Sequence, residues 1–426
     1  MALSVPYQAP DEKIFGRLAS ELVAELPERL STRVLENAKR MGDQPAIVDG
    51  SVRWSYAELG QEIYAACSWL TAMGIRPGDR IMTVSENCRA LVVLLLAASE
   101  LDVWVAIVNS RLSAQEVDLI QGNCLPRRVF YTCDASPDAC LHAERHAADR
   151  YQHPQLGGLA ISPLYDSEPE PVYASGAEQV AAMIYTSGTT GTPKGVMLTH
   201  RGILYIASIS GGMRHLSEGQ RVYGVLPMSH VFGLSSVCMG SLYNGACLYT
   251  VPRFEAALML ETLKQERITV LQGVPAMYAR ALEFLKREQR TLEAPELIYM
   301  SAGGSPLDSD TKNRVEAAFG LTLHNGYGLT EASPTISQTR IDDRHSNSTV
   351  GRVLPLLEYR LEPLGDSGSS EQPGDEVGEL WVRTQYYERL LPSAGSYPRH
   401  ANRRGLAQHR RYCQTRSRRS ALYCGA

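Results

Sequence analysis

The chain has 426 residues, of which 44% are hydrophobic and 21% are charged, and its formal net charge is −4. A chain of this length and composition can bury at least one large core, which excludes disorder as its main state. The small negative charge provides no global attraction to nucleic acid or to anionic lipid, so we expect neither as a partner.

The nine cysteines are scattered, odd in number and without a Cys-x-x-Cys pair. This pattern argues against a disulfide framework and against a zinc site, and it favours a reducing compartment. Residues 1–13 carry acids where a secretory signal needs a basic start and an apolar run. The apolar stretch 90–108 is interrupted by Glu100 and Asp102, which predicts a buried helix and strand rather than a membrane span. We therefore expect a cytoplasmic protein.

The first 150 residues alternate short apolar runs with helical patterns, in the manner of a doubly wound α/β unit. Capping boxes at Ser55-x-x-Glu58 and Ser113-x-x-Glu116 predict two helix starts, and the first helix should run to about residue 74. Strands are predicted over 80–85, 103–108 and 128–132.

A connector rich in proline, serine and acids is predicted over 163–178. Beyond it, a second α/β unit is indicated by a helical stretch at 256–266 and by strands near 181–186, 222–226, 270–273, 297–301 and 321–325. A third piece, 346–384, is β-rich and ends in the strand 378–383. The predicted fold is α/β, with two doubly wound subdomains followed by a small β-rich subdomain.

A loop rich in glycine and hydroxyl groups follows the strand 181–186, and it reads Tyr-Thr-Ser-Gly-Thr-Thr-Gly-Thr-Pro-Lys-Gly over 185–195. Glycines let backbone N–H groups approach a polyphosphate, hydroxyls donate hydrogen bonds, and Lys194 supplies a mobile charge. The loop is not a Walker loop, because Pro193 precedes the lysine and no Ser or Thr follows it. An exposed turn is the alternative interpretation of a generic glycine-rich loop.

This loop resembles the phosphate loop of the adenylate-forming (AMP-binding) superfamily, which includes acyl-CoA synthetases, peptide-synthetase adenylation domains and luciferases. Three further segments match in the family's order. Residues 301–307 resemble its adenine-binding turn, 324–331 its nucleotide and magnesium motif, and 378–383 its late strand. The resemblance covers about residues 30–384 and implies that 1–384 is the large N-terminal domain of an acyl-CoA synthetase.

The resemblance also implies a nucleotide site. Tyr327 offers a flat face to adenine, and Asn325 can present a donor and an acceptor to the base edge. Thr330 supplies an oxygen to the α-phosphate and Glu331 a carboxylate to Mg²⁺, although a lone Glu at a helix start is also favoured by the helix dipole. The implied nucleotide-binding residues are Thr186, Ser187, Gly188, Thr189, Thr190, Gly191, Gly303, Gly304, Ser305, Asn325, Gly326, Tyr327 and Gly328.

The segment 226–234 resembles the place where acyl-CoA synthetases hold a His near the substrate carboxylate and the CoA channel, and here that residue is His230. A lone His is otherwise more often structural. Amino-acid-activating relatives carry Asp after the following Phe to pair with the substrate ammonium, whereas this chain has Gly233. A simple fatty or aromatic carboxylic acid is therefore the expected substrate, with a pocket to be sought around His230, Val274, Ala302 and Gly303.

The resemblance implies a two-step reaction in which the acid and ATP form an acyl-adenylate and pyrophosphate, and the thiol of coenzyme A then takes the acyl group. The acid is already ionised at neutral pH, so the first step needs no general base. Its difficulty is that an anion attacks a polyanion. Mg²⁺ on Glu331, together with Lys194 and the loop N–H groups, is expected to absorb that charge.

The resemblance stops after Arg383. Relatives continue with Gly-Tyr-Tyr, then Thr-Gly-Asp, whose Asp holds the ribose, and then a small C-terminal domain with a catalytic Lys. Residues 385–426 match none of these, and their nine Arg and one acid give a charge of +8. We expect an aberrant, poorly ordered tail over 385–426. A tail that binds nucleic acid or acidic lipid is the alternative, and the lack of Lys argues against it.

A shift of reading frame near 384–385 accounts for this tail. When Ala407–Tyr412 is back-translated as GCT CAA CAC CGG CGA TAT and read one base later, it gives Leu-Asn-Thr-Gly-Asp-Ile. The same shift over 387–425 can restore Gly-Tyr-Tyr and Thr-Gly-Asp in the expected order. We interpret the tail as an out-of-frame read.

Loss of the ribose Asp and of the catalytic Lys predicts weak Mg-ATP binding and little ligase turnover, because single preorganised groups are worth on the order of 2–4 kcal/mol each. Two alternatives stay open. One is an amino-acid adenylation domain, against which Gly233 argues. The other is a catalytically dead nucleotide- or acyl-binding protein.

Overall fold

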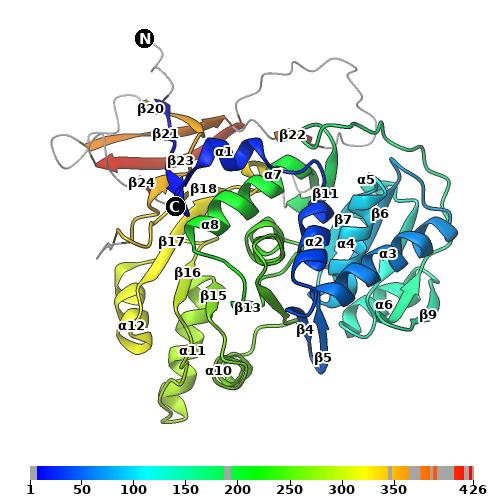
Figure 1. Cartoon of the computed structure of the whole chain (residues 1–426), viewed down its shortest axis with the longest axis horizontal. Coiled ribbons are helices and arrows are strands. Elements are labelled where there is room, and N and C mark those ends of the chain that lie inside the picture. Colours follow the sequence, from blue (N-terminus) through cyan, green and yellow to red (C-terminus); the bar gives the residue numbers. More distant parts are fainter. Residues whose placement is uncertain are drawn as a thin grey trace.

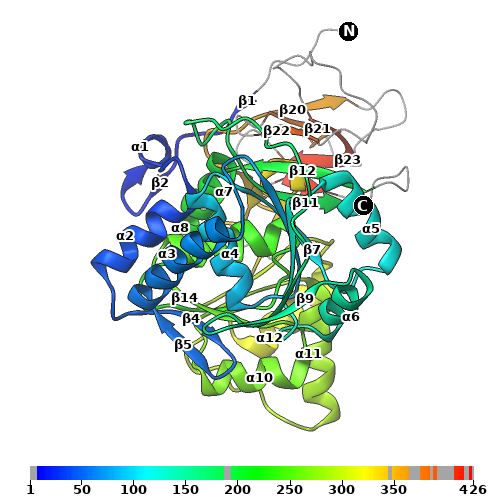
Figure 2. The same cartoon turned by 90° about the vertical axis from the view of Figure 1, so that its right-hand side faces the viewer.

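The computed structural model describes residues 7–186, 193–343, 348–363, 375–383, 387–390, 407–416 and 422–424. Two large sheets form the body of the molecule, with helices between them and on their outer faces, and a smaller sheet lies at one end (Figures 1 and 2). The α/β class predicted from the sequence is confirmed. Within the described residues, we find no helix with the length and apolarity needed to cross a bilayer.

The first sheet has eight strands, and its centre is parallel. Strand β6 (Arg80–Ser85) pairs with β7 (Trp104–Asn109) over its full length, and both strands are buried along almost their whole length. In spatial order the strands are β22 (Tyr387–Leu390), β12 (Lys194–Thr199), β11 (Val180–Thr186), β7 (Trp104–Asn109), β6 (Arg80–Ser85), β8 (Arg128–Tyr131), β10 (Gly157–Ile161) and β9 (Asp149–His153).

The second sheet has nine strands, of which the six central ones run parallel. Parallel strands have their carboxyl ends at one edge, where α/β sheets bind ligands. In spatial order the strands are β19 (Arg352–Val353), β18 (Thr335–Gln338), β17 (Leu323–Gly328), β16 (Tyr299–Ala302), β15 (Val270–Gly273), β13 (Arg221–Gly224), β14 (Cys247–Thr250), β4 (Pro45–Asp49) and β5 (Val52–Ser55).

The smaller sheet has five antiparallel strands and joins the two ends of the chain. In spatial order they are β1 (Tyr7–Gln8), β20 (Glu358–Pro363), β21 (Asp375–Arg383), β23 (Ala407–Arg416) and β24 (Leu422–Cys424). The two-stranded β2 (Lys13–Ile14) and β3 (Arg17–Leu18) form a separate hairpin. The described part of 385–426 thus contributes the backbone of β22, β23 and β24.

The main core lies between the two large sheets, around α4 (Arg89–Glu100), whose residues from Ala90 to Ser99 are all buried. With α4 pack α2 (Leu30–Arg40) and α3 (Tyr56–Ala72), and α2 also contacts α9 (Gly240–Tyr243). A helix that is apolar on all sides is stable only when it is enclosed in this way.

The outer faces of the large sheets are covered by separate helices (Figures 1 and 2). A second, smaller core lies between the first sheet and α5 (Ala114–Cys124) and α6 (Pro137–Arg145). The second sheet is covered by α10 (Ala256–Gln265), α11 (Pro275–Arg287) and α12 (Ser309–Phe319). The remaining helical segments are α1 (Ala19–Ala24), α7 (His200–Tyr205), the π-helical turns η1 (Ile206–Ser210) and η2 (Phe232–Met239), α8 (Gly211–Met213) and η3 (Thr330–Ala332).

Both predicted capping boxes form. The Oγ of Ser55 accepts from the N–H of Glu58 at 3.2 Å, and a Glu58 carboxylate oxygen accepts from the N–H of Ser55 at 2.7 Å. Ser113 and Glu116 exchange the equivalent pair at 3.3 Å and 2.8 Å. These contacts satisfy backbone donors that a helix start leaves without partners, so the local pattern alone places the start.

The boundary expected at the connector 163–178 does not separate the two sheets. The hairpin β4–β5 precedes the connector yet joins the second sheet, through the parallel pairing of Leu248 with Ile47. Strands β11 and β12 follow the connector yet belong to the first sheet. Pairing between distant strands leaves no trace in local periodicity, so the sequence pattern could not reveal this exchange.

Candidate active site

A cavity of about 370 Å³ lies at the carboxyl ends of four parallel strands of the second sheet: β13, β15, β16 and β17. The turns that follow these strands supply most of its lining. Predicted site residues that the structure brings together here are His230, Gly303, Gly304, Asn325, Gly326, Tyr327, Gly328 and Thr330, and the expected pocket residues Val274 and Ala302 also line it.

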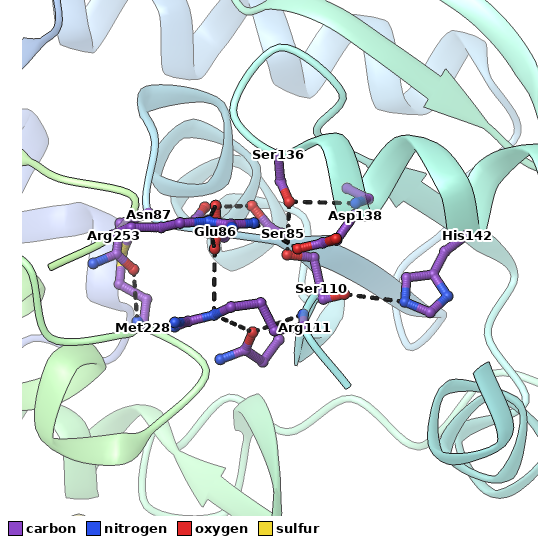
Figure 3. Close-up of polar contacts among 12 residues, drawn as sticks. Ser85, Glu86, Asn87, Ser110, Arg111, Ser136, Asp138, His142, Met228 and Arg253 are labelled. Atoms are coloured by element: carbon purple, nitrogen blue, oxygen red, sulfur yellow. Dashed lines mark hydrogen bonds and ion pairs between the residues drawn. The ribbon is translucent and has the colours of Figure 1, made fainter. Parts of the chain in front are cut away.

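The loop that carries His230 is held by Asn87, just after β6. Asn87 Nδ2 donates to the carbonyl oxygens of Gly224 at 3.0 Å and Leu226 at 2.9 Å. The N–H of Met228 donates to Asn87 Oδ1 at 2.8 Å (Figure 3). Asn87 is buried, so these bonds form away from solvent. One amide from the first sheet thus fixes a loop of the second.

The residue beside Asn87, Glu86, anchors two arginines near this loop (Figure 3). Its carboxylate is nearly inaccessible and accepts from Arg253 Nε at 2.8 and 3.0 Å, and Arg111 Nε lies 3.3 Å from it. Arg253 Nη2 also reaches Asp138 at 2.5 Å. His230 retains access to solvent, yet the protein packed around it removes enough water from the imidazole to lower its pKa, and the positive charge of Arg111 lowers it further. The imidazole is therefore neutral at pH 7.

Gly233 stands in the first turn of η2, a π-helical segment that starts at Phe232. A Cβ atom at this position would lie 2.2 Å from the carbonyl oxygen of Pro227 and 2.4 Å from that of Leu226. Neither backbone atom can move without displacing the His230 loop. No side chain, and in particular no Asp, can occupy position 233 in this backbone conformation.

At Gly326 and Gly328, the space that a side chain would need is occupied by the backbone of the neighbouring strand. A Cβ on Gly328 would lie 2.2 Å from the carbonyl oxygen of Pro334, and one on Gly326 would lie 3.2 Å from that of Ser337. Gly304 has φ of +78°, a conformation that glycine adopts without strain. The absence of side chains therefore lets β17 and β18 approach each other beneath the cavity.

Asn325 lines the cavity, yet its amide is committed to the backbone. Its Nδ2 donates to the carbonyl oxygens of Ser348 and Thr349, both at 3.1 Å, and its Oδ1 accepts from the N–H of Gly326 at 3.0 Å. These bonds fix the backbone of β17 just before Tyr327. The side chain of Tyr327 is almost buried and lines the cavity. The geometry gives Asn325 the task of fixing this turn.

Lys194, Thr186, Ser305 and Glu331 are described but do not line this cavity. Lys194 is exposed at the start of β12, and β12 contacts η3, the turn that contains Glu331. Glu331 lies beside Tyr327 at a small adjoining pocket. The predicted loop residues Ser187, Gly188, Thr189, Thr190 and Gly191 lie outside the described residues.

Several cavity residues were not found from the sequence. Arg214, Tyr299 and Gln338 line it, and Asn87 supports it, but none stands in a recognisable motif. The one available signal was Arg214 itself, a charge next to the apolar run that ends at Met213.

Comparison with known proteins agrees with this architecture. The AMP-binding enzyme family matches residues 34–389. The feruloyl-CoA synthase of an Amycolatopsis species is 29% identical over 345 residues, which cover 79% of this chain and 66% of that protein. The long-chain-fatty-acid–CoA ligase FadD13 of Mycobacterium tuberculosis is 30% identical over 340 residues, which cover 78% of this chain and 65% of that protein. The chain thus spans slightly less than two thirds of the length of these relatives.

Solved structures share the fold. The inhibitor-bound N-terminal domain of FACL13 from Mycobacterium tuberculosis superposes with a TM-score of 0.75 and 23% identity, over 93% of this chain and 99% of that one. Apo MatB from Rhodopseudomonas palustris superposes with a TM-score of 0.74 and 22% identity, over 93% and 78%. From the family match over most of its length and from this shared fold, the chain belongs to the AMP-binding enzyme family.

Proposed function

We propose that this domain activates a fatty or aromatic carboxylic acid with ATP, giving an acyl-adenylate that is passed to coenzyme A. The observation that carries the proposal is one cavity that gathers His230, the turn 303–304 and the turn 325–330 at the carboxyl ends of parallel strands. The named relatives act on ferulic and long-chain fatty acids and are 29–30% identical, which supports this class of acid.

In the proposed first step, a carboxylate oxygen of the acid attacks the α-phosphorus of ATP, and pyrophosphate leaves with the electron pair of the broken P–O bond. His230 acts as a neutral hydrogen-bond donor to the acid, because its pKa is lowered. A neutral donor orients the carboxylate without reducing its nucleophilicity as a full cation would. Lys194 and the N–H groups of its loop stabilise charge on the phosphates.

The described residues suit a Mg²⁺ ion that is bound together with the phosphates of ATP. We find no group of three or more His, Cys, Asp or Glu side chains in the described residues that could form a metal cage. Mg²⁺ instead commonly uses one or two carboxylates together with substrate phosphates. Glu331, beside Tyr327, would hold an ion that arrives with ATP, and that ion would supply charge neutralisation at the phosphates.

The amino-acid alternative is disfavoured by Gly233, since the backbone oxygens around it leave no space for the Asp that would pair with an ammonium group.

The second alternative is a nucleotide- or acyl-binding protein without turnover, and it is favoured by the content of 385–426, which lacks Thr-Gly-Asp. We propose that this segment is an out-of-frame read and that turnover by the printed chain is low. We also propose a cytoplasmic location, from the scattered cysteines.

The test is pyrophosphate release on titration of ATP with and without a fatty or aromatic acid, for the printed chain and for a frame-restored chain. We expect acid-dependent release that is strong only in the restored chain. ATP binding without release in both would support the binding-protein alternative. Thioester formation by the printed chain at the rate of the restored chain would contradict the proposed impairment.

A further inference from the structure

One cavity residue, the buried Arg214, has no part in the proposed reaction. Arg214 follows α8, is 5% exposed, and contributes to the same cavity wall as Tyr299 and Ser301. Its Nη1 donates to Gln272 Oε1 at 2.8 Å. Burial lowers the pKa of the guanidinium, and the neighbouring Tyr299 hydroxyl partly offsets that effect.

The groups around Arg214 offer donors and no negative charge. Gln272 and Ser301 are paired on neighbouring strands β15 and β16, so their side chains share one face of the sheet. Tyr299, two residues before Ser301, is on the same face. Within the described residues, Gln272 Nε2 is buried without a hydrogen-bond partner, and no carboxylate contributes to the charge balance of Arg214.

A buried cation without an anionic partner is strongly unfavourable, as is a buried amide N–H without an acceptor. An anionic oxygen group in the cavity would relieve both. A carboxylate is the best match, because its two oxygens accept from a guanidinium in a bidentate manner.

The position of this cluster fixes which part of the acid it would meet. Gly303 marks the turn at the end of β16, and Ser301 and Tyr299 lie two and four residues before it. At about 3.3 Å per residue, the cluster is set back from the turn by roughly 7 to 13 Å. It therefore faces the far end of an acid whose reacting carboxylate lies at the turn, near His230.

We infer that the preferred substrate carries a second carboxylate at its far end, bound by Arg214 with help from Ser301 and Tyr299. The inference rests on the proposed function, since it names the class of acid that enters the same cavity. A plain fatty acid would leave the buried guanidinium without an anion, so it should bind less well.

The experiment measures dissociation constants by calorimetry on the full chain, for dicarboxylic acids of four to ten carbons and for monocarboxylic acids of equal length. We expect at least one dicarboxylic acid to bind tenfold or more tightly than its monocarboxylic partner. The variant Arg214→Met should abolish that preference and strengthen binding of the monocarboxylic acid. Arg280→Met, at an exposed position on α11, is the matched control and should change neither affinity.

Equal affinity for both acids in the wild type would overturn the inference. So would an equal loss of both affinities in Arg214→Met, which would show a structural role only. Should Arg214→Met fail to fold, Arg214→Lys and Ser301→Ala should each reduce the preference for the dicarboxylic acid, and an unchanged preference in both would contradict it. Mg-ATP is titrated separately, so failure to bind ATP alongside a retained preference would contradict the proposed function while showing that the cavity still selects a second carboxylate.

Discussion

The N–H of Met228 donates to Asn87 Oδ1 at 2.8 Å, which ties the loop bearing His230 to the end of β6. Replacement of Asn87 by Ala would leave the carbonyl oxygens of Gly224 and Leu226 buried without this donor. We expect Asn87→Ala to lower the free energy of unfolding by about 2–4 kcal/mol and to weaken binding of the acid. Chemical denaturation and acid titration measure both. Asn313→Ala, at an exposed site on α12, is the control and should leave both within error.

Gly233 provides a second test of this loop. The Cβ of Gly233→Ala would lie 2.2 Å from the carbonyl oxygen of Pro227, so the loop must shift. We expect a loss of at least about 1–3 kcal/mol of stability, as for other overpacked sites. Gly122→Ala on α5, where nothing lies within 4 Å of the added Cβ, should instead stabilise by up to about 1 kcal/mol. Equal melting temperatures for the two variants would refute this account.

Glu331 is expected to act through Mg²⁺. Glu331→Gln keeps the size of the side chain and removes its charge, so ATP binding should lose most of its enhancement by Mg²⁺ and keep its metal-free affinity. Titrations of ATP with Mg²⁺ and with EDTA measure the ratio. Glu283→Gln, at an exposed position on α11, should retain the full ratio. An unchanged ratio in Glu331→Gln would assign the metal to other residues.

His200 predicts a pH dependence of stability. It is fully buried, its Nδ1 accepts from the N–H of Leu30 at 3.2 Å, and burial lowers its pKa to about 3. Below about pH 6.5 His200 is protonated in the unfolded chain, whereas in the folded chain it stays neutral down to about pH 3. The free energy of unfolding therefore falls as the pH falls through this window. Between pH 7.5 and pH 5 this residue should account for about 2 kcal/mol of the loss.

Chemical denaturation of His200→Asn across this range tests the assignment. The variant keeps a hydrogen-bond acceptor and has no titrating group, so its stability should fall less steeply with pH than that of the wild type. His215→Asn, at an exposed position, should follow the wild type. Parallel curves for all three proteins would show that His200 does not control the acid limb.

Local features of the fold could be predicted from the sequence, because they depend on neighbouring residues. The strand predicted over 80–85 is β6 without change, and the boxes at Ser55 and Ser113 start helices where expected. The partition of strands between the sheets could not be predicted, since the pairing of Leu248 with Ile47 joins residues far apart in the chain.

The same distinction applies to the site. His230, Tyr327 and the glycine turns stand in contiguous strings, and the structure brings them to one cavity. Asn87 and Arg214 act through contacts with residues 137 and 58 positions away, so no local string marks them. The close approach at Gly328 is made by the carbonyl oxygen of Pro334, a contact with the neighbouring strand that no local string predicts.

The segment 385–426 gives a prediction about the gene. We expect the coding DNA to show one base missing or extra near codon 384, with the next frame encoding Gly-Tyr-Tyr, Thr-Gly-Asp and a lysine-bearing domain. Resequencing of codons 375–426 and the DNA beyond them is the measurement. An intact frame with nothing homologous after it would contradict the out-of-frame reading and favour a binding protein.

The most direct test of the central claim, that this domain holds ATP for attack by an acid, is equilibrium binding of Mg-ATP to the full chain and to Lys194→Ala. The account predicts measurable binding by the wild type, at least a tenfold loss in Lys194→Ala, and no change in Lys286→Ala, an exposed lysine on α11. Absence of binding by the wild type, or equal binding by Lys194→Ala, would contradict it.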